Sequence, residues 1–406
     1  MSTLNYKDDM RAERVWYARA KFGQEEIDAV VKTLNEFQLS PGKYTTQFEK
    51  EVAKLFGKDH GVMVNSGSSA LLLAAELLNI QLGDEIITGA SGFPTTINPF
   101  LQKGAKVVLV DVHPETLSPK LDQIEAAINS KTKAIVVAHI WGALNDMPAL
   151  RLIADKNKVA LVEDSCDSIG QTIDDKPSGY WSDISVTSFF PSHVITACGG
   201  GGMICVKTEE EEKRLRVFRD WGRTGTDSEA LEDRFGVDLQ GIPYDAKFFY
   251  GELGYNLKAT EVQAAFGLEQ LKKLKLWNEV RANNYEWFTN LVNGLGFESV
   301  QPAATNCDPS WLAFPFYSNE RRGLATFLEN NNIQTRPILA GNFLRHPVYV
   351  DRNVEAFGNL EGADYVTRNG IGIGLHQDIG IRERHLIENA LEEFVGLSNN
   401  SRPSAD

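Results

Sequence analysis

The chain has 406 residues, of which 42% are hydrophobic and 24% charged, a composition typical of a globular protein with one large and one smaller domain. Its formal net charge of -14 argues against a protein that binds nucleic acid, which would need a basic face. The sequence has no secretory signal and no apolar run near the roughly 18 residues that span a bilayer. Four separated cysteines suit a reducing compartment, so we expect a cytoplasmic protein without a membrane segment.

Two helices are predicted over 23–57, separated by a Ser-Pro-Gly break. In the second, Phe48, Val52, Leu55 and Phe56 recur at the spacing that puts apolar side chains on one helix face. Short apolar strands then alternate with helices, and we expect the strands at 61–65, 84–90, 105–112, 133–140 and 159–164. This alternation predicts a mostly parallel sheet with helices on both faces. In such sheets the ligand lies beyond the carboxyl ends of the strands, at the loops after 65, 90, 140 and 164.

The second half of the chain has a different pattern. Strands at 182–190 and 201–207 precede a polar loop at 223–245, and a long helix is predicted from about 260 to 294. A smaller α/β unit then closes the chain. We therefore divide it into an N-terminal arm (1–22), a large domain (23–270), a small C-terminal domain with its linking helix (271–396) and a disordered tail (397–406).

The loop after the first strand, NSGSSA (65–70), leads directly into a helix. Gly67 permits close approach, Ser68 offers a hydroxyl, and the first turn of a helix has free N–H groups, which together suit a phosphate. Serine is also a common helix cap, so both interpretations stay open at this point. After the next strand comes Phe93, whose ring can either stack on a flat cofactor or fill the core.

Three carboxylates, Glu163, Asp164 and Asp167, end a buried strand, where charge is costly unless it is paired or functional. An aspartate there can keep the pyridine nitrogen of pyridoxal phosphate protonated. A metal site and a solvated turn are the alternatives, although no convincing metal-ligand spacing surrounds the motif. Further on, His193 follows SFFPS (188–192) and precedes four glycines. A histidine taken alone is more often structural than catalytic.

Together these motifs resemble the DegT/DnrJ/EryC1/StrS family of sugar aminotransferases and dehydratases, which has the aspartate aminotransferase fold. The similarity covers roughly residues 14–395 and is densest in NSGSSALLLA, EDSCDSIG, SFFPSHVIT, RDWGR, LGYNLKATEVQAA and TRPILAGNFLRHP. It implies fold type I of the pyridoxal-phosphate-dependent transferases. That fold is α/β, with a mostly parallel seven-stranded-type sheet between helices and a smaller C-terminal α/β domain.

The resemblance implies that one group of residues binds the cofactor phosphate. Gly67 and Ser68 match phosphate ligands at the start of a helix, and Ser188 matches a second phosphate hydroxyl. Asn256, in the segment LGYN, matches a residue that reaches the phosphate from a neighbouring subunit. The resemblance therefore also implies a homodimer with shared active sites.

A second group matches residues around the pyridine ring. Phe93 matches the residue that stacks on the ring, and Asp164 matches the partner of the ring nitrogen. Cys166 matches a residue packed under the ring, and Asp167 one near its edge. These four positions come from two loops that both follow predicted strands, so they can meet at one edge of the sheet.

His193 stands where the aminotransferases of this family have lysine in the pattern Ser-Phe-x-x-x-Lys. A lysine amine forms a Schiff base with pyridoxal phosphate, whereas imidazole cannot, although it can take a proton near neutral pH. The same exchange marks the family's 3-dehydratases of nucleotide-linked 4-keto-6-deoxy sugars, which use pyridoxamine phosphate. We therefore predict a 3-dehydratase of deoxysugar and O-antigen biosynthesis that removes the C3 oxygen with His193 as the base.

The chain is most similar to the CDP-4-keto-6-deoxyglucose 3-dehydratase type, which holds a [2Fe-2S] cluster with four cysteines and takes electrons from a reductase. Cys166 matches the first ligand, but the other three positions fall in TGTDSE (224–229), which has no cysteine. We therefore do not expect a [2Fe-2S] cluster and leave the reductase partner open. The GDP-4-keto-6-deoxymannose 3-dehydratases, which regenerate pyridoxamine phosphate from glutamate, offer a route that needs no cluster.

Two alternatives remain at the level of sequence: a nucleotide-sugar aminotransferase in which histidine replaces lysine, and an inactive homologue that binds ligand without turnover. The cofactor-binding residues Asp164, Ser188 and Asn256 argue against the second. Four arginines are candidates for the sugar diphosphate, because guanidinium forks suit phosphate oxygens, although surface salt bridges are the commoner use of arginine. They are Arg219, Arg223, Arg336 and Arg345.

Overall fold

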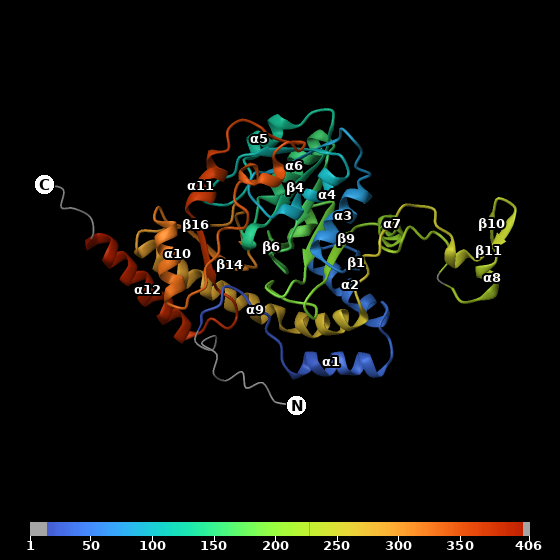
Figure 1. The fold of residues 1–406 in the computed structure, drawn as a ribbon, viewed down its shortest axis with the longest axis horizontal. Helices are drawn as coiled ribbons and strands as arrows, with labels where there is room; N and C mark the ends of the chain where they lie inside the picture. The colour runs from blue at the N-terminus through green and yellow to red at the C-terminus, as the bar shows by residue number, and fades with distance from the viewer. Residues whose placement is uncertain (1–13, 227, 401–406) are drawn as a thin grey trace.

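The computed structural model of the chain describes residues 14–226 and 228–400, with only the backbone described at 399 and 400. A mixed eight-stranded sheet lies at the centre, with helices on both of its faces (Figure 1). In spatial order its strands are β1 (His60–Val64), β9 (Gly202–Val206), β8 (Ile184–Ser188), β5 (Ala160–Asp164), β4 (Thr132–Ala138), β2 (Glu85–Gly89), β3 (Lys106–Val110) and β15 (Val354–Ala356). Only β9 runs antiparallel to its neighbours, β1 and β8. The predicted mostly parallel sheet is therefore confirmed.

Successive side chains of a strand point to opposite faces of the sheet, and here both faces carry apolar side chains that helices cover. In β3, Val107 and Leu109 pack on one side of the sheet while Val108 and Val110 pack on the other. One face is covered by α3 (Gly67–Leu77), α4 (Asn98–Gln102) and α7 (Glu209–Arg219). The opposite face is covered by α2 (Lys43–Leu55), α5 (Leu121–Ala127), α6 (Met147–Asn157) and α9 (Glu261–Gly294), with α1 (Gln24–Asn35) packed on α9.

The small domain follows the 34-residue helix α9, so the predicted domain boundary at 270 falls inside one continuous helix. Its three-stranded sheet has the order β12 (Glu298–Ser299), β14 (Ala313–Tyr317), β16 (Gly370–Gly374), and its helices are α10 (Arg321–Asn330), α11 (Glu361–Asn369) and α12 (Ile381–Asn400). A minor sheet is formed by β13 (Cys307–Asp308), β6 (Thr172–Ile173) and β7 (Lys176–Pro177). The two domains thus share α9 and this minor sheet.

A segment of the small domain is also built into the large one, because β15 pairs in parallel with β3 and makes the eighth strand of the central sheet. Just beyond β3, the buried carboxylate of Asp111 accepts hydrogen bonds from the N–H groups of Gly362 (3.0 Å) and Ala363 (2.9 Å), in the first turn of α11. Lys120 pairs with the same carboxylate at 2.9 Å. Although burial raises it, these donors hold the pKa of Asp111 below its ordinary value. Asp111 therefore fixes α11 to the central sheet.

The predicted polar loop at 223–245 belongs to an arm that projects away from the body of the molecule (Figure 1). It contains the short helix α8 (Leu231–Arg234) and the hairpin β10 (Val237–Leu239) and β11 (Ile242–Tyr244). The arm begins and ends at one place, because the Trp221 N–H donates to the Tyr255 carbonyl at 2.7 Å and the Tyr255 N–H donates to the Phe218 carbonyl at 2.7 Å.

The two chain ends differ in how far the structure describes them. Val15 pairs with Ile333 of the small domain, whereas residues 1–13 of the predicted arm lie outside the described residues. The predicted disordered tail is wrong for 397–400, which continue α12, and 401–406 lie outside the described residues. Across the described ranges, no helix has the length and apolar character needed to cross a membrane.

We expect Asp111→Ala to lower the free energy of unfolding by about 2 kcal/mol, because it leaves two buried helix N–H groups and the partly exposed Lys120 without their partner. The pKa of Asp111 is lowered in the folded state, so its stabilisation is present above the ordinary aspartate pKa and is lost as the pH falls below it. Urea unfolding at pH 7 and pH 3 tests this. Asp122→Ala, an exposed change on the following helix, is the control; equal midpoints for the two variants at pH 7 would contradict the role of Asp111.

Candidate active site

A cavity of about 750 Å³ opens at the carboxyl ends of the central strands and is closed on one side by residues 336–340 of the small domain. All four loops that the sequence indicated contribute to it: those after residues 65, 90, 140 and 164. The cavity brings together nine of the predicted site residues, namely Gly67, Ser68, Phe93, Asp164, Cys166, Asp167, Ser188, His193 and Arg336. This cavity is the candidate active site.

The first turn of α3 forms one corner of the cavity. Ser66 caps the helix by accepting a hydrogen bond from the Ser69 N–H at 3.1 Å, so Ser68 is not the cap and lines the cavity. A side chain at Gly67 would place its Cβ 2.6 Å from the Cys166 sulfur and 2.8 Å from the Ser188 Cβ. Because glycine stands here, the helix N-terminus and the two serine hydroxyls come together in an arrangement suited to a phosphate.

Asp164 lies at the floor of the cavity and is only 5% exposed. Its Oδ2 accepts a hydrogen bond from the Thr96 hydroxyl at 2.7 Å, and its Oδ1 accepts one from the Cys166 N–H at 3.1 Å. Two donors from different loops therefore fix the carboxylate. Sequence reasoning missed Thr96, which lies in a 3₁₀ turn (Pro94–Thr96) after β2.

The neighbouring carboxylate, Glu163, is not part of the cavity lining. It is fully buried and binds the Nε2 of His139 at 3.0 Å and the Ser185 hydroxyl at 2.7 Å, with a further bond from Ser178. Burial raises its pKa, but these partners lower it to about 2. His139, which the sequence analysis did not single out, is buried and also lines the cavity. Glu163 therefore has a structural role beneath the site.

Asp167 is held by the turn that follows β4. Its Oδ2 accepts a hydrogen bond from the Trp141 N–H at 3.1 Å, and Trp141 adopts the left-handed conformation at φ 53°. Burial, with a contribution from the nearby Asp164, raises the pKa of Asp167 to about 7. The carboxyl of Asp167 therefore keeps its proton to a higher pH than an ordinary aspartate does.

His193 projects into the same cavity, with its side chain 15% exposed. Its Nδ1 lies 3.2 Å from the Ser188 carbonyl oxygen, which can only accept, so Nδ1 carries the hydrogen and Nε2 has the free lone pair. The Nε2 lies 3.7 Å from Oδ1 of Asp167. Burial lowers the pKa of His193 to about 4, so the ring is neutral at pH 7. A neutral imidazole with a free Nε2 can accept a proton in this cavity.

Aromatic and cationic side chains complete the walls. Phe93 is 52% exposed and faces the cavity, not the core. Arg336 lies with its guanidinium carbon 5.7 Å from the centre of the Tyr17 ring. Tyr17, which also lines the cavity, was missed because it comes from the predicted N-terminal arm, brought here by the pairing of Val15 with Ile333.

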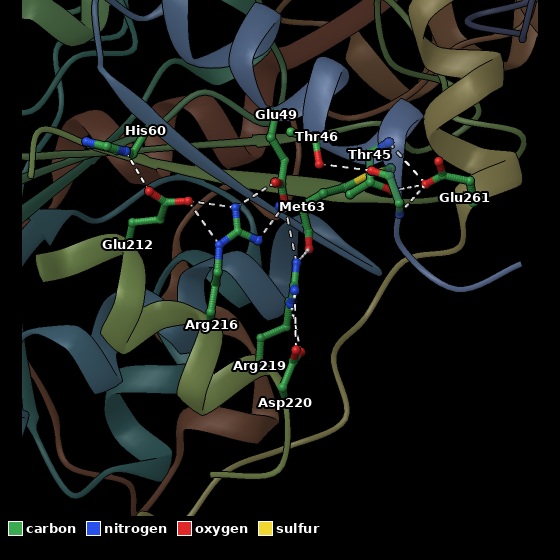
Figure 2. Close-up of polar contacts among 11 residues, drawn as sticks. Thr45, Thr46, Glu49, His60, Met63, Glu212, Arg216, Arg219, Asp220 and Glu261 are labelled. Atoms are coloured by element: carbon green, nitrogen blue, oxygen red, sulfur yellow. Dashed lines mark hydrogen bonds and ion pairs between the residues drawn. The ribbon is translucent and has the colours of Figure 1, made fainter. Parts of the chain in front are cut away.

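The structure corrects the prediction for Arg219, which does not line this cavity. Figure 2 shows it in a buried network, where it donates to Glu49 at 3.2 Å, to the Met63 carbonyl at 3.1 Å and to Asp220 at 2.8 Å. In the same network Arg216 binds Glu49 at 2.7 Å. The network joins α7 to α2 and β1 at the base of the arm, so Arg219 has a structural role in this chain.

Three other predicted residues also lie outside the cavity lining. Arg345 is exposed and ion-paired with Asp364, and its predicted role as a substrate ligand stays a prediction. Arg223 pairs through its backbone with Tyr250 at the base of the arm. Asn256 pairs there with Asp220. Its predicted role in the site of a neighbouring subunit concerns a second chain and stays a prediction.

The four cysteines are distributed over separate parts of the fold. Cys166 lines the cavity, Cys198 lies in the exposed loop before β9, and Cys205 is buried in β9. Cys307 lies in β13 and contacts the Ala304 carbonyl at 3.1 Å. Over residues 14–226 and 228–400, no group of three or more histidine, cysteine or acidic side chains is arranged to hold a metal ion.

The doubly covered, mostly parallel sheet with its cavity at the strand ends defines a protein of the aspartate aminotransferase fold. The sequence profile of the DegT/DnrJ/EryC1/StrS aminotransferase family matches residues 20–391, and the chain belongs to this family. The chain is 36% identical to the lipopolysaccharide biosynthesis protein RfbH of Salmonella typhimurium, over 93% of this chain and 90% of that protein. It is 34% identical to dTDP-4-dehydro-2,6-dideoxy-D-glucose 3-dehydratase of Saccharopolyspora spinosa, over 94% and 86%.

Solved structures of related 3-dehydratases also match this chain over most of its length. The structure of E. coli GDP-4-keto-6-deoxy-D-mannose 3-dehydratase with bound hydrated pyridoxal phosphate matches with a TM-score of 0.84 at 29% identity, covering 93% of this chain and 99% of that one. A GDP-4-keto-6-deoxymannose 3-dehydratase with a trapped pyridoxal phosphate–glutamate geminal diamine matches with a TM-score of 0.83 at 30% identity, covering 93% and 98%. The predicted fold and family are confirmed.

We expect Asp167→Asn to stabilise the cofactor-free protein at pH 8 by roughly 2 kcal/mol and to have no such effect at pH 4. The folded protein raises the pKa of Asp167 from 3.8 to about 7, so the stability due to its protonated form is complete at low pH and is lost as the pH rises through 7. Asparagine keeps the Trp141 hydrogen bond without the charge. Urea unfolding at both pH values measures the difference, with the exposed Asp59→Asn as control; a gain equal at the two pH values would count against the buried acid.

Proposed function

We propose that this protein is a 3-dehydratase that uses pyridoxamine or pyridoxal phosphate to remove the C3 oxygen of a nucleotide-linked 4-keto-6-deoxyhexose. One observation supports this above the others: the cavity contains a neutral imidazole, His193, at the position where aminotransferases of the family have lysine. A lysine would bond to the cofactor aldehyde and favour transamination. His193 can only exchange protons with it.

The cavity fits the cofactor. Ser68, Ser188 and the first turn of α3 form an anion-binding corner, which exists because Gly67 has no side chain to fill it. Phe93 offers a ring face for stacking, and Asp164 offers a carboxylate fixed by two donors for the pyridine nitrogen. When bound, the protonated pyridine ring of the cofactor supplies an electron sink.

In this proposal the protein residues orient the reactants and move protons. His193 accepts a proton at Nε2, because its Nδ1 hydrogen points to the Ser188 carbonyl. Asp167, with a pKa of about 7, is the nearest group able to exchange a proton with that nitrogen, at 3.7 Å. The Thr96 hydroxyl and the Cys166 N–H donate to Asp164 and hold its carboxylate in place for the cofactor nitrogen. Arg336 is the candidate ligand for the substrate diphosphate.

The names of family relatives support the proposed substrate class. Two curated relatives carry the name GDP-4-keto-6-deoxy-D-mannose 3-dehydratase, from Yersinia pseudotuberculosis and E. coli O55:H7, each 31% identical to this chain. Glutamate is the expected amino donor that restores the pyridoxamine form, because a structural relative has a trapped glutamate adduct. We propose no [2Fe-2S] cluster, since Thr224–Glu229 lacks the three further cysteines that such a cluster requires.

We also propose that the protein is a homodimer with shared active sites. The arm exposes several large apolar side chains, which are costly in water unless a partner covers them. They include Trp221, Leu231, Phe235, Ile242, Phe248, Tyr250 and Leu253. Asn256 lies at the base of this arm, outside the cavity of its own chain. The arm is therefore the proposed means by which Asn256 reaches the phosphate in the partner.

The deciding experiment incubates the purified protein and pyridoxamine phosphate with GDP-, CDP- and dTDP-linked 4-keto-6-deoxyhexoses, with and without glutamate. Mass spectrometry then identifies the sugar product. Loss of the C3 oxygen supports the dehydratase. An amino sugar that retains this oxygen indicates the alternative aminotransferase, and an unchanged sugar with every nucleotide indicates an inactive binding protein.

His193→Lys is expected to bond covalently to pyridoxal phosphate and to lower C3 deoxygenation at least 100-fold, because the proton acceptor becomes a tethering amine. Borohydride reduction followed by mass spectrometry detects the retained cofactor on the peptide that contains residue 193. His193→Asn is the matched control: it should lose deoxygenation without retaining the cofactor. Full deoxygenation by either variant removes His193 from its proposed role.

Mixing two inactive variants tests the shared site. His193→Asn and Asn256→Ala subunits, unfolded together and refolded, should recover about a quarter of the wild-type activity, since half of the dimers are hybrids and each hybrid has one intact site. Activity is measured against each variant refolded alone. If Asn256 serves its own chain, the mixture stays inactive.

A further inference from the structure

Tyr17 is held at the cavity by a segment whose consecutive residues are each fixed to the small domain. The Val15 carbonyl accepts a hydrogen bond from the Gln334 N–H at 2.9 Å, and the Tyr17 N–H donates to Oε1 of the same glutamine at 3.0 Å. Trp16 lies directly on β16, because a Cβ at Gly374 would stand 2.1 Å from the Trp16 carbonyl oxygen. The segment therefore gives Tyr17 a fixed place on the cavity wall.

Tyr17 contacts two parts of the cavity wall to which the proposed function gives different tasks. The guanidinium carbon of Arg336, the candidate ligand of the diphosphate, lies 5.7 Å from the centre of the Tyr17 ring. The same ring packs against the ring of Trp141, with the two centroids 5.5 Å apart. The Trp141 N–H binds Asp167 at 3.1 Å, and Asp167 in turn lies 3.7 Å from His193. Tyr17 thus borders both the proposed diphosphate region and the proposed proton-transfer region.

The hexose of the proposed substrate connects these two regions. Its C1 carries the diphosphate, while C3 and C4 carry the oxygens that react. Tyr17, Arg336, Asp167 and His193 line one cavity of about 750 Å³, so a ligand that reaches from the arginine to the histidine passes within that space. A side chain that borders both regions is therefore placed to face the sugar between them.

The Tyr17 hydroxyl can donate a hydrogen bond to a ligand. Burial, and after it the charge of Asp167, raises its pKa well above the ordinary tyrosine value, so the hydroxyl keeps its hydrogen. Its polar neighbour Trp141 offers an indole N–H, which can donate but cannot accept. Across the described ranges no residue accepts a hydrogen bond from this hydroxyl, and the bond that Tyr17 donates comes from its backbone.

Packing alone does not require the hydroxyl. A phenyl ring would fill the same space beside Trp141, and a hydroxyl removed from water without an acceptor is costly. The hydroxyl is therefore better explained by a ligand that accepts a hydrogen bond from it.

We propose that Tyr17 binds the hexose of the substrate by donating a hydrogen bond from its hydroxyl to a sugar oxygen. This inference rests on the proposed function, which supplies the nucleotide-linked hexose. The residues proposed for the cofactor belong to the large domain, whereas Tyr17 is fixed to the small one. Tyr17 therefore serves the substrate and not the cofactor.

Calorimetric titration of the full-length protein loaded with pyridoxal phosphate tests this contact. Without an amino donor the 4-keto sugar is bound but not converted, so its affinity is measured apart from turnover. The ligands are the GDP-, CDP- and dTDP-linked 4-keto-6-deoxyhexoses and the matching nucleoside diphosphates. Tyr17→Phe should weaken binding of the nucleotide sugar by roughly three- to tenfold, the contribution of one neutral hydrogen bond, and leave the nucleoside diphosphate unchanged. Equal losses for both ligands, or no loss for either, overturn the proposal.

Two further variants and the cofactor serve as controls. Tyr180→Phe makes the same chemical change at an exposed tyrosine outside the cavity and should leave both affinities unchanged; a loss equal to that of Tyr17→Phe contradicts the proposal. Arg336→Met should weaken the nucleotide sugar and the nucleoside diphosphate alike, since it removes the candidate diphosphate ligand. If it weakens the nucleotide sugar alone, the hexose does not lie where we place it. Tyr17→Phe should bind pyridoxal phosphate as tightly as wild type, and a loss there contradicts the assignment to the substrate.

The contact of Tyr17 and the proposed function fail in different ways. If wild-type protein deoxygenates the sugar while Tyr17→Phe binds it as tightly as wild type, the function stands and the role of Tyr17 is refuted. If the sugar keeps its C3 oxygen while Tyr17→Phe still weakens the nucleotide sugar alone, the proposed reaction is wrong and the contact stands. If wild-type protein binds none of the nucleotide sugars, both are wrong.

Discussion

The close approach of helix α3 to the ends of β5 and β8 is the contact on which the cavity depends. This approach is possible only because Gly67 has no side chain at the point where Cys166 and Ser188 pack against it. The approach brings the N-terminus of a helix next to hydroxyls from two other segments. Any residue with a Cβ at position 67 would push α3 away and separate Ser68 from Ser188, so the corner proposed to bind phosphate would be lost.

Desolvation shifts the pKa values of Asp167 and His193 in opposite directions and favours the uncharged form of each side chain. It raises the pKa of Asp167 and lowers that of His193, so around pH 6 the cavity holds an uncharged acid and an uncharged base 3.7 Å apart. A proton can pass between two such groups without water first having to be removed from a charged side chain. Asp164 differs from both because the Thr96 hydroxyl and the Cys166 N–H bind its two oxygens and hold the carboxylate in place.

The sequence predicted what depends on local pattern and missed what depends on distant packing. Strand–helix alternation located the four loops, and Gly67 and Asp167 were identified within them, whereas His193 was identified from its match to the lysine position of the family motif. Tyr17 was missed because no local motif indicates that an N-terminal segment reaches the cavity. Arg219 was misassigned because its motif gives its type but not its partner Glu49, 170 residues away. The strand period could have separated Glu163 from Asp164, since adjacent strand residues face opposite sides.

The two ends of the arm lie side by side at the pairing of Asp220 with Asn256, next to the network of Arg219 and Glu49 (Figure 2). The described residues between them, 221–226 and 228–255, contribute no strand to the central sheet. Its length can therefore vary without moving a single register in that sheet, since extending a loop whose ends are already joined costs little entropy. A protease that cut the arm near its tip would likewise yield two fragments that stay associated, each holding half of an intact fold.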